Sequence, residues 1–126
     1  MTGRVVHFEI PTDDLSRAQN FYGQAFGWSM TSIPEAEYLL VSTIETDDQG
    51  TPTEPGAING GMLKRSEPVT HPIVTIHVDD IDKTLEAVER LGGSTVVPRQ
   101  PVMDMGFTAY VKDSEGNTIG LWQNAS

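Results

Sequence analysis

Two ionisable side chains near the start of the chain have the type and spacing for acid–base or metal chemistry. His7 and Glu9 stand two residues apart in VVHFEI, where they alternate with Val6, Phe8 and Ile10. This period of two is typical of a β-strand with one apolar face on a core, so the imidazole and the carboxylate share the other face. A His–Glu pair can act as a general base without a metal. The simpler interpretation of His7 is a histidine that lines a pocket and forms a hydrogen bond.

The segment IVTIHV repeats this alternation and supplies two more polar candidates, Thr75 and His77. The apolar residues that alternate with these two are expected to pack under a helix: Val74, Ile76 and Val78. His77 can pair with Glu9 or His7, or it is only a polar residue at a strand end near solvent. His71, in the linker before Pro72, is expected to be exposed.

Each of these strands is followed by an amphipathic helix with candidate N-cap residues at its start. Thr12, Asp13 or Asp14 in the first case, and Asp79 and Asp80 in the second, can accept backbone N–H bonds there. Apolar residues then recur at three- and four-residue spacing, at Leu15, Ala18, Phe21, Tyr22, Ala25 and Phe26, and again at Ile81, Leu85, Val88 and Leu91. Aligning Asp14 with Asp80 brings the two apolar patterns into agreement without a gap. The chain therefore contains a duplicated supersecondary module.

Both halves read β-α-β-β-β, which predicts an α+β fold of one domain. The first module covers about residues 1–66 and the second about 70–126. Paired modules would form a curved mixed sheet with a concave site and helices outside. The polar segment 46–56 and the segment Pro98–Met105 are expected to be loops, and Gly60-Gly61 indicates a bulge or a close approach of a ligand or another chain segment.

Large side chains are expected to line the concave face together with the polar ones. Aromatic rings on such a wall can stack on a flat ligand. Strand parity places Trp122 there, whereas Trp28 is expected in the core. The predicted ligand-binding set is His7, Glu9, Met62, Thr75, His77, Tyr110 and Trp122, and Phe107 is a further candidate. Met103–Gly106 is a candidate rim loop, because flexible thioethers suit a variable partner.

Composition narrows the choice of partners. The 126 residues carry a formal net charge of −10, which disfavours nucleic acid and anionic membranes as partners. The sequence has no cysteine, which excludes disulfides and thiolate chemistry. No apolar run is long enough to cross a bilayer and no secretory signal is visible, so we expect a cytoplasmic protein.

The order and spacing of several short motifs resemble the vicinal-oxygen-chelate superfamily, which includes glyoxalase I, bleomycin-resistance proteins and extradiol dioxygenases. The matching residues are His7, Asp14-Leu15, Phe21-Tyr22, Phe26-Gly27-Trp28, Val78-Asp79-Asp80, Leu91-Gly92-Gly93, Asp113-Ser114-Glu115-Gly116-Asn117 and Ile119-Gly120-Leu121. The resemblance implies paired βαβββ modules, a bowl-shaped site and a homodimer.

The resemblance also implies a divalent metal, yet the ligand positions carry the wrong residues. The first ligand falls on His7, the second on Ile73 and the last on Gly120, while the remaining place falls in Asn59-Gly60-Gly61. A catalytic metal site needs about three protein ligands and an open position. We therefore expect no metal and no other cofactor, and a protein that binds a small molecule, of the sequestering or resistance type. The alternatives are a lyase, isomerase or dioxygenase that uses a displaced metal or His7, Glu9 and His77 as acid and base, or a domain that serves assembly.

Overall fold

Both predicted strand–helix segments are present in the computed structural model of the chain, which describes residues 2–48 and 52–126. The chain divides into two units. The N-terminal unit is His7–Pro72, and the C-terminal unit combines residues 2–6 with residues 73–126. Residues 2–6 belong to the C-terminal unit through contacts such as the 2.8 Å hydrogen bond from the His77 N–H to the Arg4 carbonyl.

The N-terminal unit has four strands in the order β2-β3-β4-β1. The pairs β2–β3 and β3–β4 are antiparallel, and β4–β1 is parallel. Its elements are β1 (Val5–Thr12), α1 (Leu15–Phe26), β2 (Ser29–Ile33), the 3-10 helix η1 (Pro34–Ala36), β3 (Tyr38–Ser42) and β4 (Gly60–Lys64). The polar loop expected at 46–56 joins β3 to β4, and its residues 49–51 lie outside the described residues.

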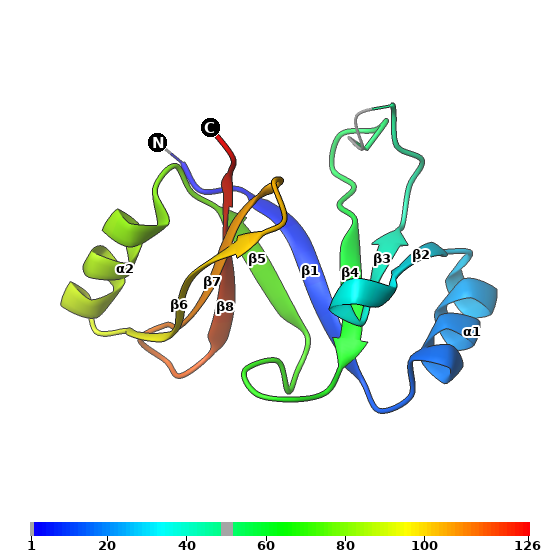
Figure 1. The fold of residues 1–126 in the computed structure, drawn as a ribbon, viewed down its shortest axis with the longest axis horizontal. Coiled ribbons are helices and arrows are strands. Elements are labelled where there is room, and N and C mark those ends of the chain that lie inside the picture. The colour runs from blue at the N-terminus through cyan, green and yellow to red at the C-terminus, as the bar shows by residue number, and fades with distance from the viewer. Residues whose placement is uncertain (1, 49–51) are drawn as a thin grey trace. The chain divides into compact units, whose positions relative to one another are not determined.

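The C-terminal unit repeats this topology, with strand order β5-β8-β7-β6. Its elements are β5 (Ile73–His77), α2 (Ile81–Arg90), β6 (Ser94–Val102), β7 (Gly106–Lys112) and β8 (Thr118–Asn124). Here too the first and last strands of the module pair in parallel, and the other pairs are antiparallel. Figure 1 shows each helix beside the strands of its own unit. The predicted α+β class and the βαβββ duplication are confirmed.

Both helices begin at the predicted aspartates with the same backbone geometry. Asp14 has φ −147° and ψ 106°, and Asp80 has φ −149° and ψ 106°. Each carboxylate accepts a hydrogen bond from the backbone N–H three residues on, at 3.0 and 3.1 Å. Gly27 ends α1 in the left-handed region at φ 75°, which a glycine adopts without steric cost. The aligned capping positions of the two modules are therefore structurally equivalent.

Each helix covers one face of its own sheet. In the N-terminal unit Leu39, Val41 and Met62 are buried, and the α1 residues that pack on them are Leu15, Ala18 and Tyr22. In the C-terminal unit the buried residues are Val78, Ile81, Ala109, Val111 and Leu121, with Leu85 and Val88 of α2 against them. As expected, Trp28 lies in the core, where its ring stacks on Tyr22 with centroids 5.0 Å apart.

Several local expectations were wrong. Strand β6 continues through Pro98 to Val102, where a loop was expected. It is the last strand in its order, so one side of its backbone needs no ladder partner, and its register shifts at Thr95/Val97 and Val97/Gln100. Val74 is 40% exposed instead of packed under α2.

Three side chains of the predicted α1 stripe are exposed instead of packed on the core: Phe21, Ala25 and Phe26. In the described residues no helix is long and apolar enough to span a membrane.

The prediction that Met62 binds a ligand on the concave face was also wrong. It is fully buried and lies opposite Ile10 and Leu39 in the ladders, so its side chain points into the core under α1. His7 and Glu9 lie on the other face of the same sheet.

The core position of Met62 gives a direct test of the N-terminal packing. Met62→Ala should lower the free energy of unfolding by about 2–5 kcal/mol, because it removes buried side-chain volume. Met103→Ala is the control, since Met103 is 60% exposed, and it should change stability by less than about 0.5 kcal/mol. Urea unfolding followed by tryptophan fluorescence measures both. Equal effects of the two substitutions would contradict the core assignment.

Candidate functional site

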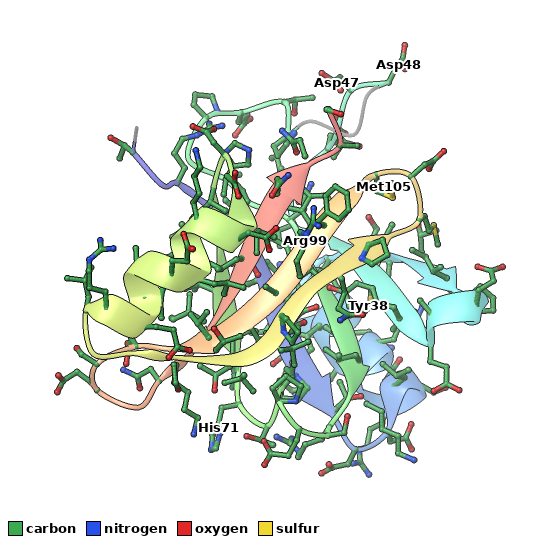
Figure 2. All side chains as sticks on the ribbon, turned by 60° about the vertical axis from the view of Figure 1, so that its left-hand side comes forward. Tyr38, Asp47, Asp48, His71, Arg99 and Met105 are labelled. Carbon is green, nitrogen blue, oxygen red and sulfur yellow. The ribbon has the colours of Figure 1, made fainter. Side chains whose placement is uncertain are left out.

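A partly buried, hydrogen-bonded chain of three side chains lies on the face of the N-terminal sheet opposite α1. The Tyr38 hydroxyl lies 2.8 Å from His7 Nε2 and donates to Glu9 Oε2 at 2.8 Å. Glu9 is only 7% exposed, so its carboxylate depends on such donors. The sequence indicated His7 and Glu9 but missed Tyr38, which is labelled in Figure 2.

Gly61 explains how the Tyr38 ring reaches β1 across the intervening strand β4. Gly61 pairs with Glu9 of β1 and with Leu40 of β3, so it lies between the two strands that carry the network. A Cβ at this position would overlap the Tyr38 hydroxyl and ring. The predicted close approach at Gly60-Gly61 is thus an approach of protein side chains: the Tyr38 ring at Gly61 and the Phe8 ring at Gly60.

Counting donors assigns the proton on the His7 ring. An ionised carboxylate only accepts hydrogen bonds, so the single Tyr38 hydroxyl proton points to Glu9. His7 Nε2 must then carry a hydrogen and donate to the Tyr38 oxygen, which leaves Nδ1 as the unprotonated nitrogen of the neutral ring. Burial lowers the pKa of His7 below 6.5, and the nearby charge of Glu9 only partly offsets that effect.

The positions where the resemblance implies metal ligands do not form a ligand set. His7 Nε2 is bonded to Tyr38. Asn59 Oδ1 accepts from the backbone N–H groups of Thr43 and Ile44, at 2.8 and 3.4 Å, and so closes the loop between β3 and β4. The other two positions are the buried Ile73 and the side-chain-free Gly120.

Two further observations bear on that ligand set. A Cβ at position 120 would meet Thr75 Oγ1 at 2.7 Å, so Thr75 already occupies the space beside it. Nowhere in residues 2–48 and 52–126 do three or more His, Asp or Glu side chains form a group that could hold an ion. The residues present do not fit the divalent metal that the resemblance implies.

The C-terminal unit brings four of the predicted ligand-binding residues onto one face, opposite α2. Thr75 and Tyr110 both pair with Gly120, and His77 pairs with Trp122. Thr75 is buried and the other three are half-buried. This face is polar and aromatic, whereas Phe107, on the opposite face, packs on the core and lies under the Arg99 guanidinium at 4.9 Å from the ring centroid (Figure 2).

Asn124 is a second residue that the sequence analysis missed. Its Oδ1 accepts from Trp122 Nε1 at 2.8 Å, and its Nδ2 lies 3.3 Å from His77 Nε2. The signal was present in the sequence, because a residue two positions after Trp122 in a strand shares its face. Asn124 therefore links two predicted binding residues of β5 and β8.

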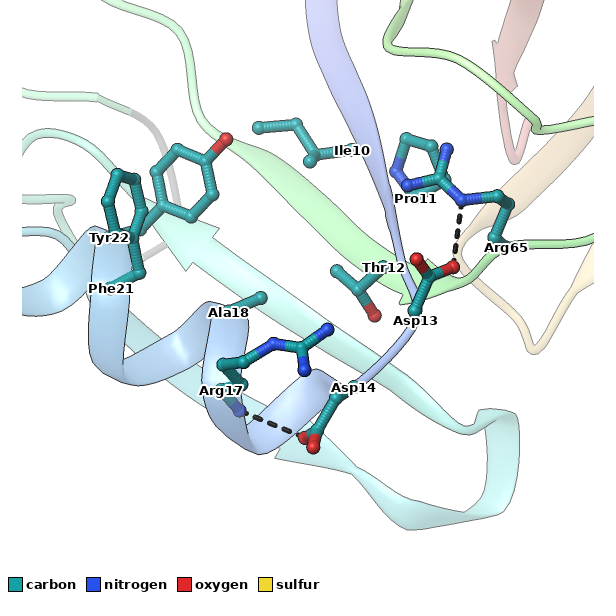
Figure 3. A pocket seen from close by; sticks show the side chains of 10 residues that line it. All are labelled: Ile10, Pro11, Thr12, Asp13, Asp14, Arg17, Ala18, Phe21, Tyr22 and Arg65. Carbon is teal, nitrogen blue, oxygen red and sulfur yellow. Dashed lines mark hydrogen bonds and ion pairs between the residues drawn. The ribbon is translucent and has the colours of Figure 1, made fainter.

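A separate pocket of about 300 Å³ lies at the start of α1 (Figure 3). Its lining residues come from the end of β1, α1 and the segment after β4: Ile10, Pro11, Thr12, Asp13, Asp14, Arg17, Ala18, Phe21, Tyr22 and Arg65. Arg65 and Asp13 form an exposed ion pair at 2.9 Å, a type of contact that adds little stability. This pocket contains none of the predicted ligand-binding residues.

Paired βαβββ units with a polar and aromatic sheet face define the class of fold, and sequence comparisons identify the family. A model of the family described as "Bleomycin resistance protein-like N-terminal" matches residues 4–43. A glyoxylase-like domain-containing protein of Didymella fabae is 32% identical over 94% of this chain and 92% of its own length. The chain belongs to the glyoxalase/bleomycin-resistance/dioxygenase superfamily.

Other relatives agree with this membership. A protein named probable lactoylglutathione lyase from Vibrio cholerae is 29% identical over 96% of this chain and 91% of its own length. The putative glyoxylase CFP32 of Mycobacterium bovis is 28% identical over 91% of this chain, which spans only 43% of that protein. A solved member of the superfamily from Vibrio splendidus shares the fold, with a TM-score of 0.64 at 15% identity over 98% of this chain and 99% of that one.

The lowered pKa of His7 makes stability depend on pH in a defined direction. The unfolded chain protonates His7 near pH 6.5, and the folded chain does so only at a lower pH. Between these two values the unfolded state binds more protons, so the free energy of unfolding falls as pH falls, by at most about 1.4 kcal/mol per pH unit. Above pH 6.5 the group contributes no slope. His7→Gln should flatten this part of the curve, as measured by urea unfolding at a series of pH values.

The control for that measurement is His71→Gln, because His71 is exposed in the segment between β4 and β5. It should leave the slope unchanged. A slope that is the same in wild type and His7→Gln would show that burial does not suppress protonation of His7.

Proposed function

We propose that this chain binds a small organic molecule on the sheet face of its C-terminal unit that carries Thr75, His77 and Trp122, without the divalent metal typical of its superfamily. The observation that carries the proposal is the hydrogen bond between His7 Nε2 and Tyr38. This bond occupies Nε2, one of the two ring nitrogens of His7, and His7 is the residue that aligns with a metal ligand. The role is binding or sequestration of the resistance type, which needs a shaped surface and no reactive centre.

The metal-free part of the proposal is supported by chemistry at each aligned position. Hard divalent ions prefer carboxylate oxygens, and zinc sites add histidine or cysteine. Isoleucine at 73 and glycine at 120 supply no donor. The nearby carboxylate of Glu9 is held by the Tyr38 hydroxyl.

The binding part is supported by the composition of the C-terminal sheet face. Trp122 and Tyr110 offer aromatic surface, and Thr75 and His77 offer hydrogen-bonding groups among them. Ligand sites are typically apolar walls with a few placed polar groups. The net charge of −10 favours a cationic ligand over an anionic one and disfavours nucleic acid and anionic membranes as partners. We further propose a homodimer, as the family resemblance implies, and a cytoplasmic location, as expected from the sequence.

A second candidate function is enzymatic, because relatives at 29% identity include a protein named probable lactoylglutathione lyase. The Glu9–Tyr38–His7 chain is the feature that favours it. A neutral buried imidazole with a free Nδ1 lone pair can accept a proton, and a carboxylate relayed through a phenol stabilises the resulting charge. In that case His7 is the base of a metal-independent lyase or isomerase. A metal-dependent lyase, isomerase or dioxygenase would require ligands other than the aligned ones.

Metal analysis tests the metal-free proposal. Protein purified without chelators should contain no stoichiometric metal, and titration with Zn²⁺, Ni²⁺, Mn²⁺ and anaerobic Fe²⁺ should show no tight one-to-one binding by calorimetry. His7→Ala and His71→Ala are the matched pair, one at the aligned position and one exposed. Stoichiometric metal binding that is lost in His7→Ala and kept in His71→Ala would overturn the metal-free proposal.

A thermal-shift screen of planar and cationic small molecules tests the binding face. A true ligand at about a hundred times its Kd should stabilise the protein by about 2.7 kcal/mol. Trp122→Ala should abolish the shift, while Phe21→Ala, in the separate pocket at α1, should retain it. A ligand whose shift is lost in Phe21→Ala and kept in Trp122→Ala would move the binding site to the pocket of Figure 3.

A further inference from the structure

Asn124 joins the two most distinctive side chains of the C-terminal sheet face. It extends from the last residue of β8, accepts from the Trp122 indole at 2.8 Å and approaches His77 Nε2 at 3.3 Å. His77 and Trp122 are register partners on β5 and β8, so they are neighbouring residues on the same sheet face. One amide thereby contacts both rings.

The chemistry of the indole fixes the orientation of that amide. Trp122 Nε1–H is a donor only, so the oxygen of Asn124 must face it. The NH₂ group of Asn124 then faces His77 and can only donate. His77 Nε2 must therefore be the unprotonated nitrogen of the neutral ring, and its hydrogen sits on Nδ1.

The indole is also confined along the benzene edge that adjoins Nε1. A Cβ built at Gly106 would lie 2.6 Å from Trp122 Cζ2 and 3.0 Å from Cη2. The benzene edge of the ring therefore rests where only a glycine leaves room. The Trp122 Nε1 atom is therefore bonded to Asn124 while the adjoining Cζ2–Cη2 edge lies over Gly106, and these two contacts together set the orientation of the ring before any ligand arrives.

We propose that Asn124 is a positioning residue that presets His77 Nδ1–H as a hydrogen-bond donor beside a fixed Trp122 ring. The corner formed by these three residues then selects planar molecules that carry a hydrogen-bond acceptor at their edge. Within the part of the chain that the structure describes, no protein acceptor for His77 Nδ1 is present. The choice of ligand class rests on the proposed binding function, whereas the tautomer of His77 does not.

The tautomer is tested on the full chain by long-range ¹H–¹⁵N NMR at mildly alkaline pH. In wild type, His77 Nε2 should resonate as an unprotonated nitrogen and Nδ1 as a protonated one. Asn124→Asp is nearly isosteric, but its carboxylate accepts on both sides, so it should move the proton to Nε2 and keep the Trp122 hydrogen bond. Asn124→Ala should return His77 to the Nε2–H form that free histidine favours.

The Trp122 indole N–H signal serves as the folding control, since it should be retained in Asn124→Asp. If His77 has the same tautomer in wild type, Asn124→Asp and Asn124→Ala, Asn124 does not position it and the proposal fails. If wild-type His77 carries its hydrogen on Nε2, the donor assignment itself is wrong.

Two matched probes test the ligand class. Quinoline carries a ring nitrogen that accepts a hydrogen bond, and naphthalene has the same shape without it. Quinoline should perturb the Trp122 indole and His77 signals of wild type at lower concentration than naphthalene. In Asn124→Asp its binding should weaken about three- to tenfold, the loss expected for one hydrogen bond, with no change for naphthalene.

Equal binding of the two probes in wild type, or perturbation by neither, would overturn the ligand class even if the tautomers agree. Failure of the binding function as a whole would give a different pattern. In that case the tautomers respond to Asn124 as expected, while the thermal-shift screen yields no compound that depends on Trp122.

Discussion

The N-terminal sheet face is organised by one constraint, which is that the buried carboxylate of Glu9 must receive hydrogen bonds. A phenol on β3 meets this need, and it can reach across β4 only because position 61 has no side chain. The same hydroxyl then accepts from His7, which fixes the tautomer of His7 and engages its Nε2 nitrogen. Tyr38 and the neighbouring pair His7 and Glu9, which are distant from it in sequence, thus share one requirement. A buried polar network of this kind must be satisfied as a whole.

Local signals in the sequence were sufficient to predict the fold. Strand alternation, the capping aspartates Asp14 and Asp80 and the glycine stop at Gly27 are all set within a few residues of each other, and the structure confirms them. The second half of strand β6 was not predicted, because Pro98 and Pro101 are typical of a loop. A strand at the end of the strand order tolerates proline. Phe21 and Phe26 fit the helical period as well as Tyr22 does, and only the width of the covered face decides which of them is buried.

The candidate site was less predictable because its polar partners come from other strands or depend on register. His7 and Glu9 were visible as an alternating pair, but Tyr38 lies 31 residues from His7 and became its partner only through the β1–β4–β3 ladder. Met62 was assigned to the wrong face because GGMLK has no alternation from which to read parity. One residue of register exchanges the two faces of a strand, so such short glycine-containing strands give little information about side-chain direction.

Each of the two histidines of the candidate sites has one ring nitrogen in contact with the protein, and only His7 stands at a position that aligns with a metal ligand. At His7 the protein accepts a hydrogen from Nε2, so the remaining nitrogen of the neutral ring is an acceptor. At His77 the protein donates to Nε2, so the remaining nitrogen is a donor. A metal-binding imidazole must present an unprotonated nitrogen to the ion, and only the first arrangement leaves one free of protein contacts. With isoleucine at 73 and glycine at 120, that single nitrogen has no partner ligand at the aligned positions. In each unit, therefore, a neighbouring side chain fixes the hydrogen-bonding role of the remaining ring nitrogen, and a role fixed in this way is what the proposed recognition of an organic molecule requires.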